Sequence, residues 1–325
     1  MPREEVGAPR QDLSAQPSVS APSARLRGAD PFRMPLGPEA AARQQVPLLY
    51  GQGGPRVLGL DRCAAFRSRT AVARRRVAVA GLFNTGTNLL FQLLLKNCAL
   101  DQAPMFQVPW GKHNPLHWRG RHWAPRGRGR HVDVSAILPL VTIKDPLSWM
   151  ASMCRSPYAA HFGRGAKAAA GEHGSTGLCP SPLPATATKV AWQPKRVYKY
   201  SSLPDLWNRW YREYVDASLP AVLVRYEDLL FDPERTVAPL CTCAGGRLRN
   251  GTFRTVEDAA KTRAAGHRTI TDRSSALSKY GSERERYRRY SRVDLDFVRR
   301  AVDPELLRFF AYRVRPGGAL NATSR

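Results

Sequence analysis

The sequence predicts an α/β protein with a central parallel sheet flanked by helices. Two segments follow the order strand, tight turn, helix, and their strands lie at Arg75–Gly81 and Pro139–Ile143. A third apolar run, Ala221–Arg225, has the length and the β-branched content of another buried strand. Parallel neighbours need a crossover connection, which is usually a helix, so this alternation indicates a parallel sheet.

The composition is that of a folded, strongly basic protein. The chain has 325 residues, of which 43% are hydrophobic and 9% aromatic, and these values exclude disorder throughout. The formal net charge is +25, and most of the 51 basic residues are arginines. Such a charge fits a polyanionic partner, but the arginine bias of a GC-rich coding sequence also produces it, so function must be argued from motifs. No apolar run reaches the roughly 18 residues of a membrane span.

Three regions are expected along the chain. Residues 1–75 are rich in Pro, Ala, Ser and Arg without an apolar period, which predicts a flexible basic tail, with an organelle transit peptide as the alternative. Residues 76–315 form the folded domain, with a low-complexity insertion at 163–190 that is either passive or a lid over the substrate. Residues 316–325 are expected to form a C-terminal tail.

Helix signals follow the predicted strands. Thr87–Lys96 is apolar on nearly every side, as in a helix packed between a sheet and other helices. Asp145 and Asp232 are each followed by proline, a combination typical of an N-cap and a first helical turn. The last helices are expected at 295–302 and 304–312. An apolar and aromatic stripe at helical spacing is predicted to be core; it consists of Leu206, Trp207, Trp210, Tyr211, Tyr214 and Val215.

The cysteines indicate neither a metal site nor a disulfide framework. They stand at positions 63, 98, 154, 179, 241 and 243, with no zinc-ligand spacing, in a chain long enough to fold without disulfides. Free thiols are therefore expected. Glycosylation sequons begin at Asn250 and Asn321 and give weak support for a secretory lumen. The cytoplasm and the Golgi lumen both remain open as the compartment.

The segment Gly81–Asn88 has the pattern of a phosphate-binding loop. Gly81 and Gly86 stand five residues apart between a strand and a helix, so backbone N–H groups and the helix N-terminus can converge on an anion. Thr87 occupies the position of the lysine that reaches the β and γ phosphates in nucleotide hydrolases. The loop therefore favours a phosphate ligand and argues against ATP or GTP hydrolysis.

Several motifs together resemble those of sulfotransferases. Phe83–Asn88 is similar to the family's 5′-phosphosulfate loop, whose usual pattern is Pro-Lys-Ser-Gly-Thr-Thr. Lys144, Pro146 and Ser152 match the spacing of an Arg, a Pro and a Ser that follow the next strand in the family. Val224–Glu234 resembles a late strand and acidic turn of the same family. The resemblance covers roughly residues 76–313.

The resemblance implies a fold related to P-loop nucleotide kinases, with 3′-phosphoadenosine 5′-phosphosulfate as co-substrate and no metal. The residues that it assigns to the 5′ phosphate are Asn84, Thr85, Gly86, Thr87 and Asn88. Lys144 and Ser152 would hold the 3′ phosphate. The family's late glycine-rich loop has no clear match, and Arg268 and Arg273 are expected to replace it.

The same resemblance suggests the catalytic groups. Trp110–Pro115 is similar to the stretch that carries the acceptor base in many cytosolic members, which makes His113 the candidate general base, with Glu227 or Asp228 as alternatives. Asn84 stands where the family has Lys or Arg and brings no charge to the leaving oxygen. Lys112 is the expected replacement.

The implied reaction moves a sulfuryl group to a hydroxyl or amine of a small molecule or glycan, with a carbohydrate among the candidates. A kinase on the same architecture is one alternative, and it would need carboxylates for magnesium. A nucleic-acid binder is the other, less favoured alternative. It would use a basic stretch with interleaved aromatics, namely Trp118, Arg119, Arg121, Trp123, Arg126, Arg128 and Arg130.

Overall fold

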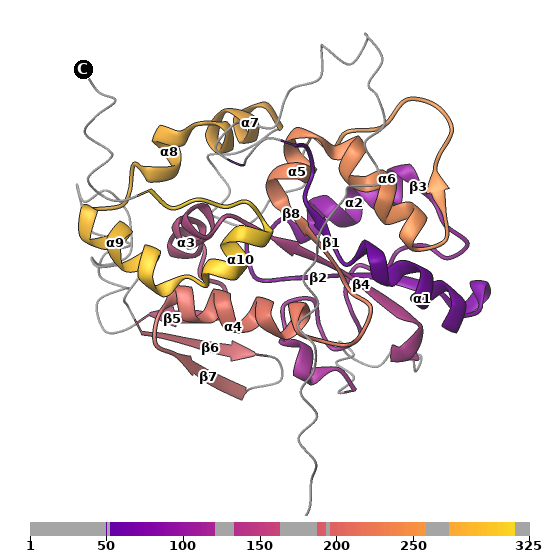
Figure 1. Ribbon diagram of the computed structural model, residues 1–325, viewed down its shortest axis with the longest axis horizontal. Helices are drawn as coiled ribbons and strands as arrows, with labels where there is room; N and C mark the ends of the chain where they lie inside the picture. The colour runs from indigo at the N-terminus through magenta and orange to yellow at the C-terminus, as the bar shows by residue number, and fades with distance from the viewer. Residues whose placement is uncertain are drawn as a thin grey trace, which may run out of the picture. The chain divides into compact units, whose positions relative to one another are not determined.

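The computed structural model describes residue 50 and residues 53–120, 133–162, 187–192, 196–257 and 273–315. In these residues the α/β prediction is confirmed, because a four-stranded sheet of order β1-β8-β4-β2 has helices on both faces (Figure 1). β2 (Arg76–Gly81), β4 (Ile137–Ile143) and β8 (Val222–Arg225) are parallel. β1 (Val57–Leu58) runs antiparallel to β8, so the sheet is mixed and not purely parallel.

The expected tail of residues 1–75 is too long, because the folded region begins before residue 76. Val57 in β1 pairs with Val224 in β8, and α1 (Cys63–Arg69) buries Phe66 in the core. The few apolar residues of this segment are separated by charged ones, so they produce no period in the sequence. Their partners lie far along the chain. Residues 1–49 and 51–52 of the expected N-terminal tail, and residues 316–325 of the expected C-terminal tail, lie outside the described part.

The central strands are buried on both faces, as expected for the parallel part of a sheet covered by helices. All seven residues of β4 are buried. In β2, Val77 and Val79 join one core cluster, whereas Ala78 and Ala80 join the other. Two layers of helix therefore enclose the sheet.

One helical layer consists of α1, α2 (Thr87–Asn97) and α6 (Pro233–Cys243). The other consists of α3 (Pro146–Arg155), α4 (Leu203–Val215), α9 (Arg292–Ala301) and α10 (Pro304–Phe309). The aromatic stripe on α4 is confirmed as core, since Trp207, Trp210 and Tyr211 are almost completely buried. None of the described helices is both long enough and apolar enough to cross a membrane.

The helix starts agree with the predicted caps. Asp145 caps α3 by accepting a hydrogen bond from the Ser148 backbone N–H at 3.0 Å. Asp232 is the N-cap residue of α6 but makes no side-chain cap bond. Between β8 and α6 lies the short helix α5 (Tyr226–Phe231). The other helices within the described residues are α7 (Arg273–Gly281) and α8 (Glu283–Tyr287), together with the short 3-10 turns Leu60–Arg62, Val72–Arg74, Leu116–Trp118 and Val134–Ala136.

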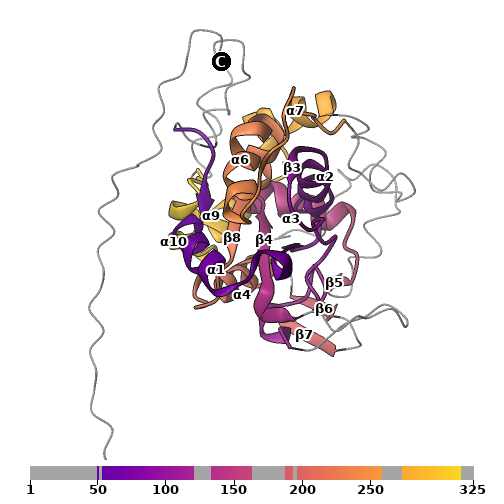
Figure 2. The same cartoon turned by 90° about the vertical axis from the view of Figure 1, so that its right-hand side faces the viewer.

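Two smaller sheets complete the fold. β3 (Cys98–Ala99) pairs with β9 (Arg247–Leu248), and β5 (Ala160–Phe162), β6 (Thr188–Trp192) and β7 (Arg196–Tyr200) form an antiparallel sheet. The insertion expected at 163–190 therefore ends too late, because residues 188–190 belong to β6. Its residues 163–186 lie outside the described part. In the views of Figures 1 and 2, the β5–β7 sheet lies at the end opposite α6 and α7.

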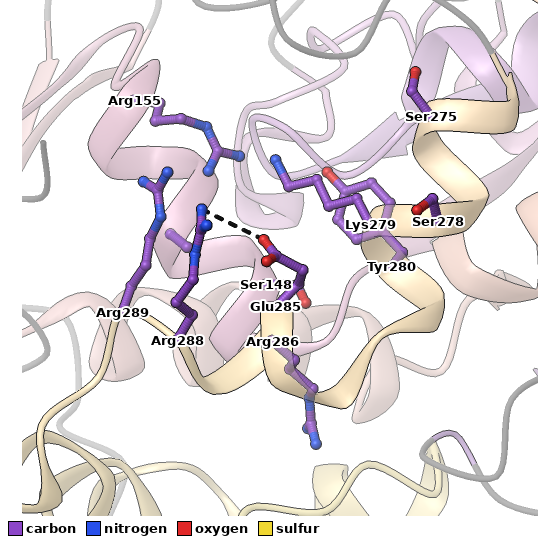
Figure 3. Close-up of a pocket in the computed structure, with 11 residues that line it drawn as sticks. Ser148, Arg155, Ser275, Ser278, Lys279, Tyr280, Glu285, Arg286, Arg288 and Arg289 are labelled. Carbon is purple, nitrogen blue, oxygen red and sulfur yellow. Dashed lines mark ion pairs between the residues drawn. The ribbon is translucent and has the colours of Figure 1, made fainter. Parts of the chain in front are cut away.

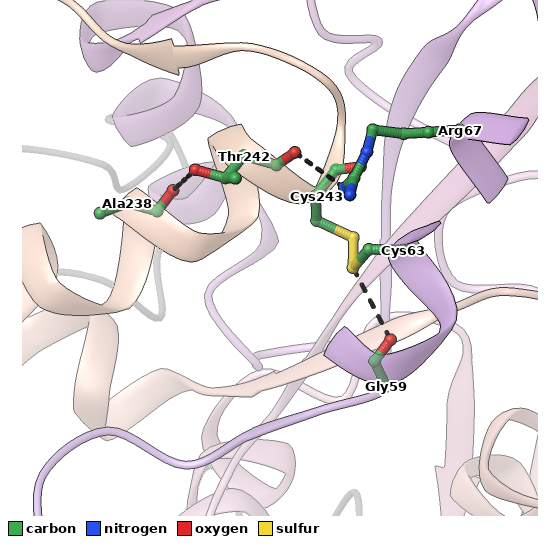
Figure 4. Close-up of a disulfide and its surroundings, with 6 residues drawn as sticks. All are labelled: Gly59, Cys63, Arg67, Ala238, Thr242 and Cys243. Atoms are coloured by element: carbon green, nitrogen blue, oxygen red, sulfur yellow. Dashed lines mark hydrogen bonds between the residues drawn. A yellow bond between two sulfur atoms is a disulfide. The ribbon is translucent and has the colours of Figure 1, made fainter. Parts of the chain in front are cut away.

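The expectation of free thiols is wrong. Cys63 in α1 is disulfide-bonded to Cys243 in α6, with 4.9 Å between their Cα atoms (Figure 4). Cys98 in β3 is bonded to Cys241, with a Cα separation of 5.4 Å. Cys154 is disulfide-bonded as well. The partners stand 180 and 143 residues apart in the first two bonds, so only the packing of α6 beside α1 and β3 reveals the pairing.

Candidate functional site

The phosphate loop, Gly81–Asn88, connects the end of β2 to the start of α2. Gly86 is the N-cap of α2 with φ 84°, and a Cβ there would overlap the ring of Tyr226. This close approach requires glycine. Thr85 donates a hydrogen bond from its hydroxyl to the Leu82 carbonyl at 2.7 Å. The loop is thus held in a defined shape before a helix N-terminus, which is the arrangement that binds anions.

The side chain of Asn84 is not directed as expected for a catalytic group. Its Nδ2 donates to the Ser156 carbonyl at 2.8 Å and to the Met153 sulfur at 3.4 Å, so both amide hydrogens are directed at the C-terminal end of α3. Its φ of 62° lies in the left-handed region, which Asn tolerates better than most residues. In this structure the Asn84 side chain fastens the phosphate loop to α3.

Lys112 and His113 are brought directly to the phosphate loop. The Gly81 N–H donates to the Lys112 carbonyl at 2.9 Å, and His113 Nδ1 lies 2.7 Å from the Gly81 carbonyl. Lys112 Nζ donates to Asn88 Oδ1 at 3.0 Å in the first turn of α2 and lies 3.3 Å from the centre of the Phe106 ring. Lys112 is only 6% exposed. The Lys112 ammonium is therefore held beside the N-terminus of α2, where the anion is expected to bind.

The environment of His113 selects one tautomer of its neutral ring. A carbonyl oxygen only accepts hydrogen bonds, so the contact with Gly81 puts the hydrogen on Nδ1 and leaves Nε2 as the acceptor nitrogen. The ring lies 4.8 Å from that of Phe83, and the His113 carbonyl accepts from Trp210 Nε1 at 3.0 Å. Such a fixed ring with an acceptor nitrogen has the form required of a general base.

Lys144 joins the second predicted motif to the phosphate loop. Its Nζ lies 3.5 Å from the Asn84 carbonyl, 3.3 Å from Ser152 Oγ and 2.8 Å from the Tyr280 hydroxyl. The ammonium also lies 4.2 Å from the centre of the Tyr280 ring. Lys144 and Ser152 therefore meet as their spacing of eight residues predicted. Tyr280 on α7 is a third member of this cluster that the sequence did not reveal.

The Tyr280 hydroxyl is unusually acidic. Burial by itself raises its pKa, but the positive charges of Lys144 and Lys279 outweigh burial and lower the pKa to about 8. The pKa of Lys279 is also lowered to about 8, chiefly by burial and further by nearby Arg155 and Lys144. Positive charge thus accumulates around this hydroxyl, and an anion placed there would be stabilised.

A basic cavity opens beside the Lys144 cluster between α3, α7 and α8. Its volume is about 400 Å³, and five basic residues line it, namely Arg155, Lys279, Arg286, Arg288 and Arg289. Figure 3 shows Arg155 and Lys279 directed toward the same space, whereas Arg286 points away from it. Glu285 pairs with Arg288 at 3.4 Å. Arg155 Nη2 also lies 3.3 Å from Ser152 Oγ, so the cavity is continuous with the Lys144 cluster.

More than a hundred residues separate Arg155 on α3 from the cations on α7 and just after α8, and for that reason sequence reasoning missed the cluster. Arg273, which was expected here, begins α7 and donates to the Leu230 carbonyl at 3.2 Å. It does not line the basic cavity. The helix that it begins nevertheless supplies Lys279 and Tyr280. Arg268 lies outside the described residues.

The two acidic alternatives for the general base are structural. Glu227 is completely buried, accepts from the Asp145 backbone N–H at 3.1 Å and from the Tyr312 hydroxyl at 2.8 Å, and burial and Asp145 raise its pKa to about 7. Asp228 is completely buried in a two-point ion pair with Arg225. Both carboxylates are therefore bonded within the core, whereas His113 lies against the phosphate loop.

Comparisons of this chain with protein-family models, with curated proteins and with solved structures found no match. Within the described residues, no group of three or more His, Cys, Asp or Glu side chains is arranged to hold a metal ion. The site nevertheless has a defined geometry. That geometry combines a phosphate loop, a buried lysine and a histidine at the end of β2 with a second cluster of cations at the end of β4.

Proposed function

We propose that this protein is a sulfotransferase with a fold related to P-loop nucleotide kinases and that 3′-phosphoadenosine 5′-phosphosulfate is its sulfuryl donor. The observation that carries the proposal is the meeting of the two motifs that are predicted to bind anions. Lys144 Nζ contacts Ser152 Oγ at 3.3 Å and lies 3.5 Å from the Asn84 carbonyl in the phosphate loop. A nucleotide with phosphates at both its 5′ and 3′ positions fits two neighbouring sites, whereas an ordinary adenosine nucleotide needs only one.

The donor's two phosphates have separate binding groups in this proposal. The backbone N–H groups of Thr85–Asn88 and the N-terminus of α2 hold the 5′ phosphate. Lys144 and Ser152 hold the 3′ phosphate, and the cations of the basic cavity strengthen the field there. Tyr280 gives up its contact with Lys144 when the phosphate arrives.

Lys112 and His113 carry the chemistry in this proposal. The acceptor's oxygen or nitrogen forms a bond to sulfur as the bond between sulfur and the 5′-phosphate oxygen breaks. His113 Nε2 takes the acceptor's proton, and the Lys112 ammonium stabilises the charge on the leaving oxygen. Lys112 fits this role better than Asn84, whose amide is directed at Ser156 and Met153. Catalysis then consists of positioning and charge stabilisation.

Isothermal calorimetry with the product nucleotide, 3′-phosphoadenosine 5′-phosphate, tests the donor assignment. We expect micromolar binding in the presence of a chelator and much weaker binding of AMP. Transfer of label from the sulfated donor to a panel of small hydroxyl compounds and glycans then identifies the acceptor. Equal binding of AMP and the product nucleotide contradicts the proposal. Magnesium-dependent ATP binding would favour a kinase, and RNA binding without nucleotide binding would favour a nucleic-acid-binding protein.

A further inference from the structure

An exposed turn follows β9 at the end of α2 that is remote from the phosphate loop. It contains the sequon Asn250-Gly251-Thr252, and all three residues are exposed. α2 has eleven residues, so a rise of about 1.5 Å per residue puts this end roughly 15 Å from the loop. Modification of the turn would therefore leave the nucleotide site open.

The turn is held at its base and open at its tip. The Asn97 carbonyl accepts from the Arg249 N–H at 2.7 Å, and the Asn97 side chain bonds both the N–H and the carbonyl of Arg254, at 2.7 and 2.9 Å. These bonds close the segment between residues 249 and 254. Gly251 has φ 99°, and a Cβ built on it would meet no atom within 4 Å. The tip of the turn is therefore accessible to a large enzyme.

The disulfides indicate the compartment in which the turn would meet a glycosylating enzyme. Cys98–Cys241 and Cys63–Cys243 connect the elements next to the turn, and such bonds persist in oxidising compartments such as the secretory lumen. Asparagine in an accessible sequon is the acceptor for oligosaccharide transfer in the same lumen. Two independent features of the chain thus agree on one environment.

We infer that Asn250 is an N-glycosylation site and that the protein matures in the secretory lumen. In the reaction, Asn250 Nδ2 forms a bond to the anomeric carbon of an oligosaccharide. The bond between that carbon and a lipid diphosphate carrier breaks, and the amide loses one proton. This inference does not depend on the proposed function.

The test is expression of the full chain in cultured eukaryotic cells, followed by enzymatic removal of N-glycans in heavy-oxygen water. This treatment converts a glycosylated asparagine into labelled aspartate, which peptide mass spectrometry detects. We expect the label at Asn250. We also expect Asn250→Gln and Thr252→Ala to lose one glycan in gel mobility, whereas Thr252→Ser should retain it.

Asn321→Gln is the matched control for the other sequon, and it should leave the label at Asn250 unchanged. An unlabelled Asn250 peptide from the wild-type chain overturns the inference, whether the chain remained outside the lumen or passed through it. Label at Asn321 alone overturns the site as well. Two different substitutions in the Asn250 sequon guard against a folding defect in either one.

Discussion

Replacement of Lys144 by methionine gives the sharpest test of the second anion site. Lys144 is 2% exposed, and its ammonium contacts Ser152 Oγ and the Tyr280 hydroxyl. Methionine fills a similar volume without the charge. A charge-assisted hydrogen bond contributes about 1.5 to 3 kcal/mol, so affinity for 3′-phosphoadenosine 5′-phosphate should fall roughly ten- to a hundredfold. Affinity for AMP should hardly change.

Calorimetric titration of both nucleotides into wild type and Lys144→Met measures this selectivity directly. Lys96→Met is the matched control, because Lys96 is an exposed lysine at the other end of α2. Thermal unfolding of each variant in the absence of nucleotide shows whether the fold survives. If a folded Lys144→Met binds both nucleotides as tightly as wild type, or loses both affinities together, the 3′-phosphate site is elsewhere and the proposed role of Lys144 is wrong.

Three further predictions concern protons. Because the phenolate of Tyr280, with its pKa of about 8, competes for Lys144, affinity for the product nucleotide should fall about tenfold from about pH 7 to about pH 9. Tyr280→Phe should make this profile shallower in calorimetry, with a residual fall from Lys279, whose pKa is also about 8. An unchanged profile would refute the competition. His113→Ala should lower turnover about a hundredfold without weakening donor binding, whereas His117→Ala, at an exposed histidine, should do neither. Folding raises the pKa of Glu227 from 4.5 to about 7. The protonated side chain therefore contributes fully to stability below about pH 4.5, and this contribution is lost as the pH rises through about 7. Glu227→Gln should thus stabilise the protein by roughly 1 to 3 kcal/mol at about pH 8 in urea unfolding, and equal stability of the two proteins would contradict the assignment.

Local patterns in the sequence determined the central elements of the fold. The three parallel strands, the start of α3 at Asp145 and the buried stripe on α4 were all predictable, because apolar period and capping residues act over a few positions. Gly86 was predictable as well, since a phosphate loop needs a residue without a side chain at that turn. The same local reasoning predicted that Lys144 and Ser152 meet, because eight residues span about two turns of helix.

Only the tertiary structure decided which distant residues meet. β1 and α1 carry too few apolar residues to show a period, and the sheet edge and α6 that bury them lie more than a hundred residues away. The amide of Asn84 turned toward α3 because its hydrogen-bond partners, Ser156 and Met153, arrive there through packing. The basic cavity gathers cations from α3, from α7 and from the segment that follows α8. These charges act on one space only because the packing of the helices brings them together.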